Sequence, residues 1–182
     1  MKKKIYILLI IISGILLVGC TNSMTAREAV RDYLEMYVTL DNKVIEQIDE
    51  YVENEEFNEE QKKIYKEILK KEYSTLSYEI LNETYDGDVA YVKTKVKVMD
   101  LYKVQKDSSD YYENHKEEFN DEKGIYDKSK FLTYKLKQMM DATETTTYEI
   151  EFKVIKEDNN WNVSQLSNED LEKIHGIYKY EE

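Results

Sequence analysis

Residues 89–98 read Val-Ala-Tyr-Val-Lys-Thr-Lys-Val-Lys-Val, and this stretch decides the fold class. Successive side chains of an extended chain point to opposite faces, so the lysines fall on one face and the small and β-branched side chains fall on the other. The second face is formed by Ala90, Val92, Thr94, Val96 and Val98. The alternation predicts a strand of an antiparallel sheet with one buried face and one face in water.

A hairpin is predicted directly before this strand, and a second strand pair is predicted near the end of the chain. Tyr85-Asp86-Gly87-Asp88 supplies a turn in which glycine takes the positive φ that other residues avoid. Residues 76–80 before it alternate, as do residues 148–154 later in the chain. Asp158-Asn159-Asn160 then predicts a turn into a last strand that holds Trp161 and Val163.

Helical periodicity precedes the first strand. Thr25 and Glu28 have the spacing of a capping box, and apolar residues at three and four residue spacing predict a helix over residues 25–39. Asp41 is placed to cap a second helix, and Asn58 with Gln61 to cap a third. The sequence therefore predicts three N-terminal helices.

Helical spacing returns in residues 107–142, which predicts a helical insertion between strands with Gly124 as the break between two helices. Asp107-Ser108-Ser109-Asp110 is interpreted as the helix cap of this segment. A short closing helix is capped by Ser167, with Ile174 and Tyr178 on its buried side. The predicted fold class is α+β, a curved antiparallel sheet packed against N-terminal helices, in a single domain over residues 25–182.

The N-terminus carries a targeting signal. Three lysines at positions 2–4 precede the apolar run 5–18, which is too short to span a bilayer comfortably. Leu17-Val18-Gly19-Cys20 resembles the lipobox of bacterial lipoproteins. The resemblance implies a signal peptide over residues 1–19, cleavage between Gly19 and Cys20, and a diacylglyceryl group, with acyl chains such as palmitate, on Cys20.

Residues 20–24 would then be a lipidated tether, and two acyl chains would hold the protein stably on the membrane. A plain secretory leader with an incidental cysteine and an uncleaved membrane helix are the alternatives. The resemblance to a lipobox implies that the domain lies on the extracytoplasmic face of the cell membrane. The abundance of Lys, Glu, Ile, Asn and Tyr is typical of low-GC Gram-positive bacteria.

Charge excludes one class of partner. The formal net charge is −12, and it falls to −15 when the leader with its three lysines is removed. Nucleic acid is therefore not expected as a partner, because binding phosphates needs a basic face.

The hairpin residues Gly87-Asp88-Val89-Ala90 and the later stretch Asn159-Asn160-Trp161-Asn162-Val163 resemble the nuclear transport factor 2-like, cystatin-like superfamily over residues 25–166. The resemblance implies a curved sheet that wraps around helices and leaves a conical pocket at one end. The segment 107–142 and the C-terminal helix depart from a minimal member. The superfamily contains isomerases, dehydratases, ligand-binding proteins and envelope lipoproteins, so the fold alone does not decide the function.

Few residues carry recognisable chemistry. His115 and His175 lack metal-ligand spacing and are interpreted as structural, with His175 at a helix end. No catalytic residue, metal or cofactor is predicted. The candidate pocket residues are tyrosines on predicted inward faces, where packing is the competing interpretation. They are Tyr33, Tyr37, Tyr78 and Tyr148.

The leading functional hypothesis is a membrane-anchored, non-enzymatic module that binds a small ligand or another surface protein. The alternative is a small pocket enzyme that performs acid-base chemistry on a small molecule. In a third hypothesis, the segment 107–142 is an arm that docks a partner.

Overall fold

The computed structural model describes residues 24–180, and the predicted lipidation and cleavage residues Cys20 and Gly19 lie outside this range. The described chain is α+β, as predicted. Its helices and strands, in chain order, are α1 Ala26–Val38, α2 Asn42–Glu53, α3 Glu59–Thr75, β1 Ser77–Asp86, β2 Val89–Met99, α4 Leu101–Asn114, the 3₁₀ helix η1 Lys116–Phe119, α5 Lys128–Asp141, β3 Thr145–Glu157, β4 Asn160–Val163 and α6 Asn168–Ile174.

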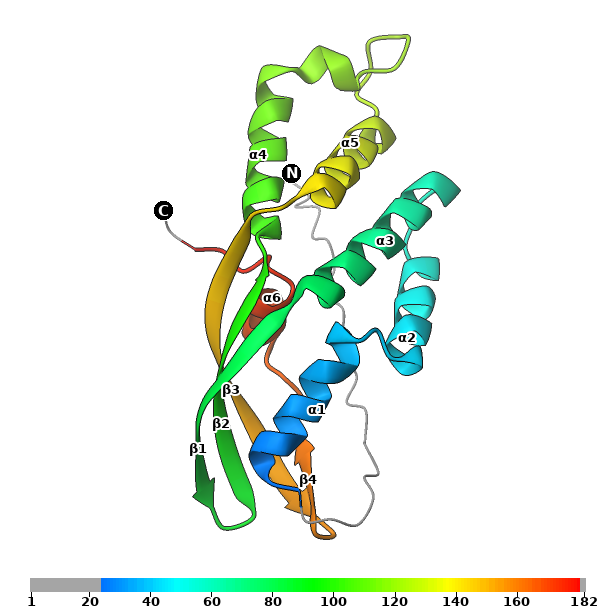
Figure 1. Cartoon of the computed structure of the whole chain (residues 1–182). Coiled ribbons are helices and arrows are strands. Elements are labelled where there is room, and N and C mark those ends of the chain that lie inside the picture. Colours follow the sequence, from blue (N-terminus) through cyan, green and yellow to red (C-terminus); the bar gives the residue numbers. More distant parts are fainter. Residues whose placement is uncertain (1–23, 181–182) are drawn as a thin grey trace.

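The four strands form one curved antiparallel sheet in the order β1-β2-β3-β4 (Figure 1). The strand at residues 89–98 is confirmed, because its predicted inner residues, from Ala90 to Val98, are fully buried. Across the sheet they meet the buried residues Ile150, Phe152 and Val154 of β3. The outer lysines face water, and the Lys93 ammonium lies 2.6 Å from the Glu149 carboxylate. The buried face of β2 and β3 is thus one wall of the core.

Helices α1 and α3 pack against the sheet, α2 packs on α3, and the predicted caps of all three helices are confirmed. The Thr25 and Asn58 side chains form reciprocal capping boxes with Glu28 and Gln61, and Asp41 caps α2. Capping bonds of this kind satisfy backbone N–H groups that have no partner within the helix. Helix α1 packs against the sheet through Tyr33, whose ring meets Phe152 edge to face at 6.1 Å.

The segment between β2 and β3 is helical, as predicted, but its first helix begins earlier than predicted. Asp100, not Asp107, caps α4, because the Asp100 Oδ1 accepts a hydrogen bond of 3.0 Å from the Lys103 N–H. Ser108 and Ser109 lie inside α4, and each hydroxyl donates to the carbonyl four residues before it, at 2.7 and 2.8 Å. Bonded this way, they do not compete for the backbone N–H groups that a cap would bind.

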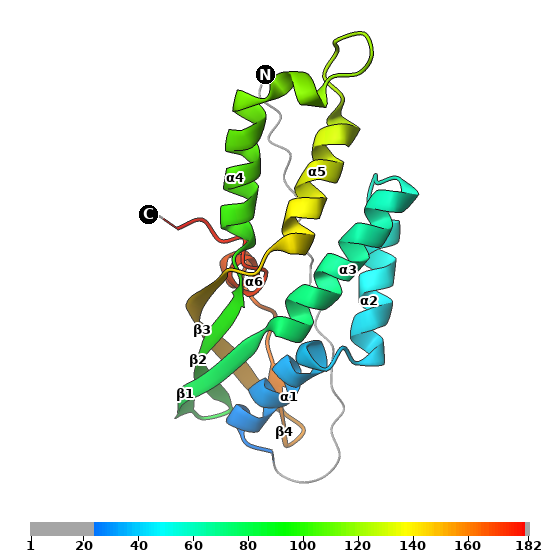
Figure 2. The same cartoon turned by 45° about the horizontal axis from the view of Figure 1, so that its top comes forward.

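Helices α4 and α5, with η1 and the loop between them, form an arm, residues 101–141, that projects beyond the sheet (Figure 1, Figure 2). Gly124 lies in the loop with φ of 76°, which confirms the predicted break. Phe119 is buried and contacts the rings of Tyr112, Phe131 and Tyr134. The arm therefore has an aromatic core of its own, which stiffens it far from the main core.

The closing helix is shorter than predicted. Ser167 caps α6 as expected, but the helix ends at Ile174, so Tyr178 lies beyond it and not on its face. The reason is Gly176, which has φ of 59° and reverses the chain beside β2. Its carbonyl accepts a hydrogen bond of 2.7 Å from the Tyr102 N–H at the start of α4. The C-terminal segment is thereby attached to the base of the arm.

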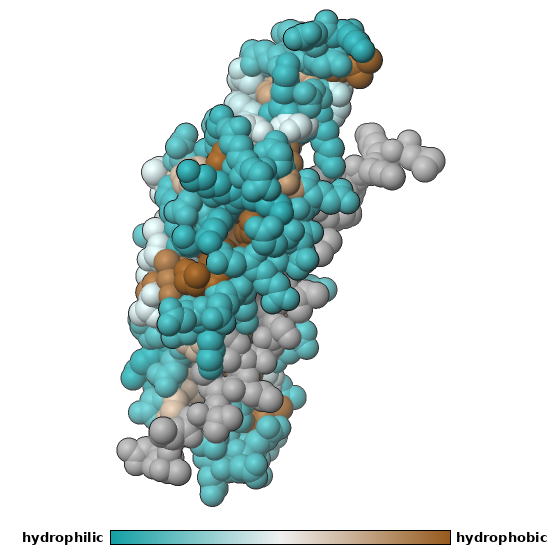
Figure 3. All heavy atoms as spheres, turned by 90° about the vertical axis from the view of Figure 1, so that its right-hand side faces the viewer, coloured by the Kyte–Doolittle hydropathy of each residue, from teal (hydrophilic) through white to brown (hydrophobic). Residues whose placement is uncertain are grey.

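The surface seen from the α2 and α3 side is mostly hydrophilic, with small and separate apolar patches (Figure 3). This agrees with the acidic composition of the chain. None of the helices within residues 24–180 combines the length and apolar character that crossing a bilayer requires.

Candidate ligand-binding groove

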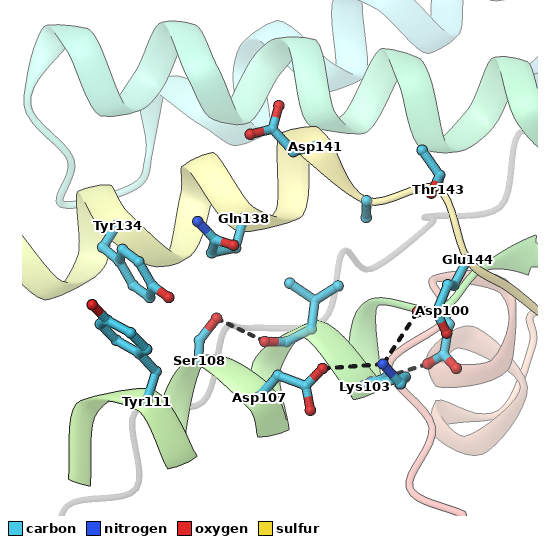
Figure 4. A pocket seen from close by; sticks show the side chains of 12 residues that line it. Asp100, Lys103, Asp107, Ser108, Tyr111, Tyr134, Gln138, Asp141, Thr143 and Glu144 are labelled. Carbon is cyan, nitrogen blue, oxygen red and sulfur yellow. Dashed lines mark hydrogen bonds and ion pairs between the residues drawn. The ribbon is translucent and has the colours of Figure 1, made fainter. Parts of the chain in front are cut away.

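A groove of about 370 Å³ lies between α4 and α5 and is closed at the sheet end by the residues that lead into β3 (Figure 4). Its volume is near the lower limit of small-molecule sites. The lining residues are Asp100, Lys103, Val104, Asp107, Ser108, Tyr111, Tyr134, Gln138, Asp141, Ala142, Thr143 and Glu144. We call this the arm groove.

The spacing of residues on the two helices explains the walls of the arm groove. Val104, Asp107, Ser108 and Tyr111 follow the three and four residue spacing that brings side chains onto one face of a helix. Ser108 is only 1% exposed, and a small side chain there leaves room that a larger one would fill.

One end of the arm groove is strongly polar. The Lys103 ammonium lies 3.2 Å from the Asp107 Oδ2 and 3.2 Å from the Glu144 Oε1. Asp100 adds a third carboxylate, whose Oδ2 accepts a hydrogen bond of 2.6 Å from the Tyr180 hydroxyl. Hydrogen bonds to Asp107 and Glu144 raise the pKa of Lys103. Two carboxylates bond the Lys103 ammonium and a third lines the same end, so this end carries net negative charge.

The other end is aromatic. Tyr111 of α4 and Tyr134 of α5 point toward one another (Figure 4), and their rings stack with centroids 5.0 Å apart. His115 stacks on Tyr111 at 3.9 Å, and the Tyr111 hydroxyl donates to the Glu118 Oε2 at 3.0 Å. That hydrogen bond raises the pKa of Tyr111. The stack fixes the width of the groove at this end.

Helix α3 holds the arm against the body of the protein at both ends of α5. The Gln61 amide, which is buried, donates to the Ser129 carbonyl and to the Thr133 hydroxyl at 3.1 and 3.0 Å. The Lys71 ammonium donates to the carbonyls of Met140 and Ala142 at 2.6 and 2.8 Å, where the α5 dipole favours a cation. The groove is consequently built on rigid elements.

A second hollow of about 500 Å³ lies between the start of α3 and α5. Asn58, Ser129 and Thr133 line it, and all three belong to the hydrogen-bonded contact with Gln61 or to its edge. These polar groups already serve to dock α5 on α3. The arm groove is therefore the better candidate for a ligand.

The predicted pocket tyrosines do not line the arm groove. Tyr33 and Tyr37 are buried in the main core and contact each other edge to face, with centroids 5.4 Å apart. Tyr78 and Tyr148 are half-buried beside Val96, and their hydroxyls donate to the Glu35 Oε1 and the Tyr178 carbonyl. Burial raises the pKa of all four phenols. Their role as pocket residues stays a prediction.

The histidines lie at two separate places. His115 caps the end of α4, and His175 caps the end of α6 as the sequence predicted. The sequence did not reveal that His175 is buried against Glu72 of α3, with the Nδ1 and Oε1 atoms 2.5 Å apart. No group of three or more His, Cys, Asp or Glu within residues 24–180 is arranged to hold a metal ion.

The pKa of Lys135 on α5 reports how completely water is excluded from the contact between α4 and α5. Burial lowers the pKa of Lys135 to about 8, and its ammonium donates to the Gln105 Oε1 at 3.2 Å. Because the unfolded chain has the ordinary lysine pKa of 10.5, it binds more protons than the folded protein between about pH 8 and 10.5. Burial of the charged Lys135 ammonium therefore lowers the free energy of unfolding most below pH 8, and this cost decreases as the pH rises to 10.5.

We expect Lys135→Met to raise the free energy of unfolding by about 1–2 kcal/mol at pH 7, with the gain shrinking as the pH rises from 8 to 10. Urea unfolding of both proteins across this range measures it. Lys137→Met, on the exposed side of the same helix, is the control and should change the free energy of unfolding little. A pH-independent difference for Lys135→Met would contradict the assignment.

Comparison with known proteins identifies a structural likeness but no family. No protein-family model matches the chain, and no curated protein matches it. The structure is similar to that of YcdA, a candidate lipoprotein from Bacillus subtilis subsp. subtilis str. 168, with 14% sequence identity and a TM-score of 0.41. The alignment covers 87% of this chain, which spans about half (49%) of that one. The resemblance to the nuclear transport factor 2-like superfamily stays a prediction.

Proposed function

We propose that this chain is a lipid-anchored, extracytoplasmic binding protein, held on the cell membrane through Cys20, whose arm groove takes a small ligand. The observation that carries the binding function is the arm groove itself. It is open to solvent, combines a charged end with an aromatic end, and is formed by two helices that α3 holds in place.

Binding is better supported than acid-base catalysis. Burial raises the pKa of Tyr65, Glu72 and Tyr73, and all three are buried in the core and do not line the arm groove. A general acid or base must reach the proton that it transfers. The groove does contain ionisable groups, but the pKa shifts of Lys103 and Tyr111 are upward, away from neutral pH, so they do not tune these groups for acid-base catalysis.

The proposed anchor fixes the orientation of the molecule. Helix α1 begins at the end of the domain opposite to the arm (Figure 1). The tether of residues 20–24 spans at most about 3.5 Å per residue, so the start of α1 would stay close to the bilayer. The arm would point away from the membrane.

We expect a fluorophore on the arm to be farther from the membrane than one on the opposite end. Acylation of Cys20 leaves the mature chain without a free thiol, so Lys123→Cys in the arm loop and Asp158→Cys in the β3–β4 turn can each be labelled singly. Energy transfer to an acceptor lipid should be clearly stronger from position 158 in vesicles of neutral lipid. Equal transfer from both positions would contradict the orientation.

The anchor has its own test. Cys20→Ser should abolish incorporation of radiolabelled palmitate and move the protein out of the membrane fraction, because a serine hydroxyl cannot form the thioether. Membrane retention of this variant without lipid labelling would mean that the leader stays on as a membrane helix.

A further inference from the structure

We propose that the ligand of the arm groove is a small organic amine, with an ammonium group for the charged end and an aromatic or aliphatic body for the rest. This inference rests on the proposed binding function, and it goes beyond it by naming the charge and shape of the ligand. The groove combines three features that together select this class.

The first feature is the charge at the sheet end. Asp100, Asp107 and Glu144 contribute three carboxylates, while Lys103 contributes the one cation among the lining residues. Asp141 also lines the groove, although its side chain points away from α4 (Figure 4). A phosphate or carboxylate ligand would meet repulsion here, whereas a cation would relieve it.

The second feature is the ammonium that already lies in this end. Lys103 bonds one oxygen of Asp107 and one oxygen of Glu144, each at 3.2 Å. The groove thus shows that these carboxylates accept an ammonium at hydrogen-bonding distance. Within residues 24–180 the second oxygen of each has no partner, so both carboxylates can accept from a further N–H donor.

The third feature is the remainder of the lining. Val104 and Ala142 are apolar, the Gln138 amide can donate or accept, and Tyr111 with Tyr134 closes the far end. About 370 Å³ accommodates a compound with a single ring or a short chain. The body of an amine bound at the charged end would lie along this apolar and aromatic floor.

Tyramine and 4-hydroxyphenylacetate make a matched pair of probes, because they share a phenol ring and differ in the sign of the charged group. Spermidine is the aliphatic probe. Each is titrated into the full acylated chain in detergent micelles, with dissociation constants from calorimetry. Labelling alanine methyl groups locates the binding, because Ala142 lines the groove while Ala26, Ala29 and Ala90 are buried in the main core.

The expected result is a shift of the Ala142 methyl resonance with tyramine, and at least tenfold weaker binding of 4-hydroxyphenylacetate. Asp107→Asn should weaken tyramine binding about fivefold to tenfold, as the loss of one charge-assisted hydrogen bond predicts. Asp110→Asn removes the same charge from an exposed position of α4 outside the groove and should change the affinity less than twofold.

The other outcomes separate the two proposals. If both probes shift the Ala142 resonance and 4-hydroxyphenylacetate binds as tightly as tyramine, the amine assignment is wrong, but the arm groove remains a binding site. Shifts of all four alanines, or binding insensitive to Asp107→Asn, would also overturn it. If neither amines nor the acid shift Ala142 at millimolar concentration, both the amine assignment and the proposed groove function are wrong.

Discussion

Replacing Gly176 with alanine is expected to lower the free energy of unfolding by about 3 kcal/mol or more and to release the C-terminal segment from the base of the arm. A Cβ atom at this position would lie 1.8 Å from the Met99 carbonyl oxygen and 3.0 Å from its carbon. Both are backbone atoms, so no side-chain rotation can relieve the overlap. The left-handed φ of 59° adds strain for any residue with a Cβ.

Gly87→Ala is the matched control for this prediction. Gly87 has nearly the same φ, 60°, but a Cβ there would meet nothing within 4 Å. Gly87→Ala should lower the free energy of unfolding only by the conformational cost of a left-handed alanine, about 1 kcal/mol. Urea unfolding of both variants measures the difference, and hydrogen exchange at the Tyr102 amide, which donates to Gly176, reports release of the segment. Equal destabilisation by the two substitutions would show that the close approach to Met99 is unimportant.

Features encoded within a few residues were predictable from the sequence. The alternation in residues 89–98, the turn at Gly87 and the caps at Thr25, Asn58 and Ser167 all match the structure. Each depends on side chains within a few positions of the backbone groups that they satisfy or the face that they bury. Local rules suffice for such features.

The predicted start of α4 was wrong because the local sequence is compatible with two different helix caps. Asp100 follows the apolar end of β2 and precedes Leu101, so the pattern there reads as a continuing strand, while the Asp-Ser-Ser-Asp run at 107–110 has the composition of a cap. In the structure the Asp100 side chain caps α4, while its N–H donates to the Glu144 carbonyl at 2.9 Å, next to the last strand pair of Met99 with Thr145. The contact is long-range and leaves no local signature.

The arm groove was not predictable for the same reason. Its walls, α4 and α5, are brought together by the stacking of Tyr111 on Tyr134, and α3 holds α5 in place through Gln61 and Lys71. The spacing of Asp107, Ser108 and Tyr111 on α4 was the available signal, and interpreting residues 107–110 as a cap concealed it. The predicted tyrosines, by contrast, lie on inward faces, and Tyr33 and Tyr37 among them belong to the main core.

The contact between Glu72 and His175 is the second place where one substitution should have a large effect. Both side chains are almost fully buried, with exposed fractions of 2% and 5%, and they join α3 to the end of α6 next to Gly176. Burial raises the pKa of Glu72, while His175 opposes that rise. His175→Phe keeps a ring of similar shape against Tyr73 but leaves the carboxyl without its partner.

We expect His175→Phe to lower the free energy of unfolding by about 3–5 kcal/mol at pH 7, the usual cost of leaving a buried charge unpaired. With the folded pKa of Glu72 above its unfolded value of 4.5, the folded protein binds more protons, so stability falls as the pH rises above about 4.5. The variant should therefore lose less stability near pH 4.5 than near pH 7. Urea unfolding at the two pH values measures this.

The double variant Glu72→Met, His175→Phe completes the test. It removes the carboxyl as well as the imidazole, and we expect it to regain most of the stability that His175→Phe loses and to lose the dependence on pH above 4.5. A double variant as unstable as His175→Phe would instead mean that the imidazole contributes through its packing against Tyr73. Recovery would establish that Glu72 and His175 stabilise the fold as a pair, each present because the other is buried beside it.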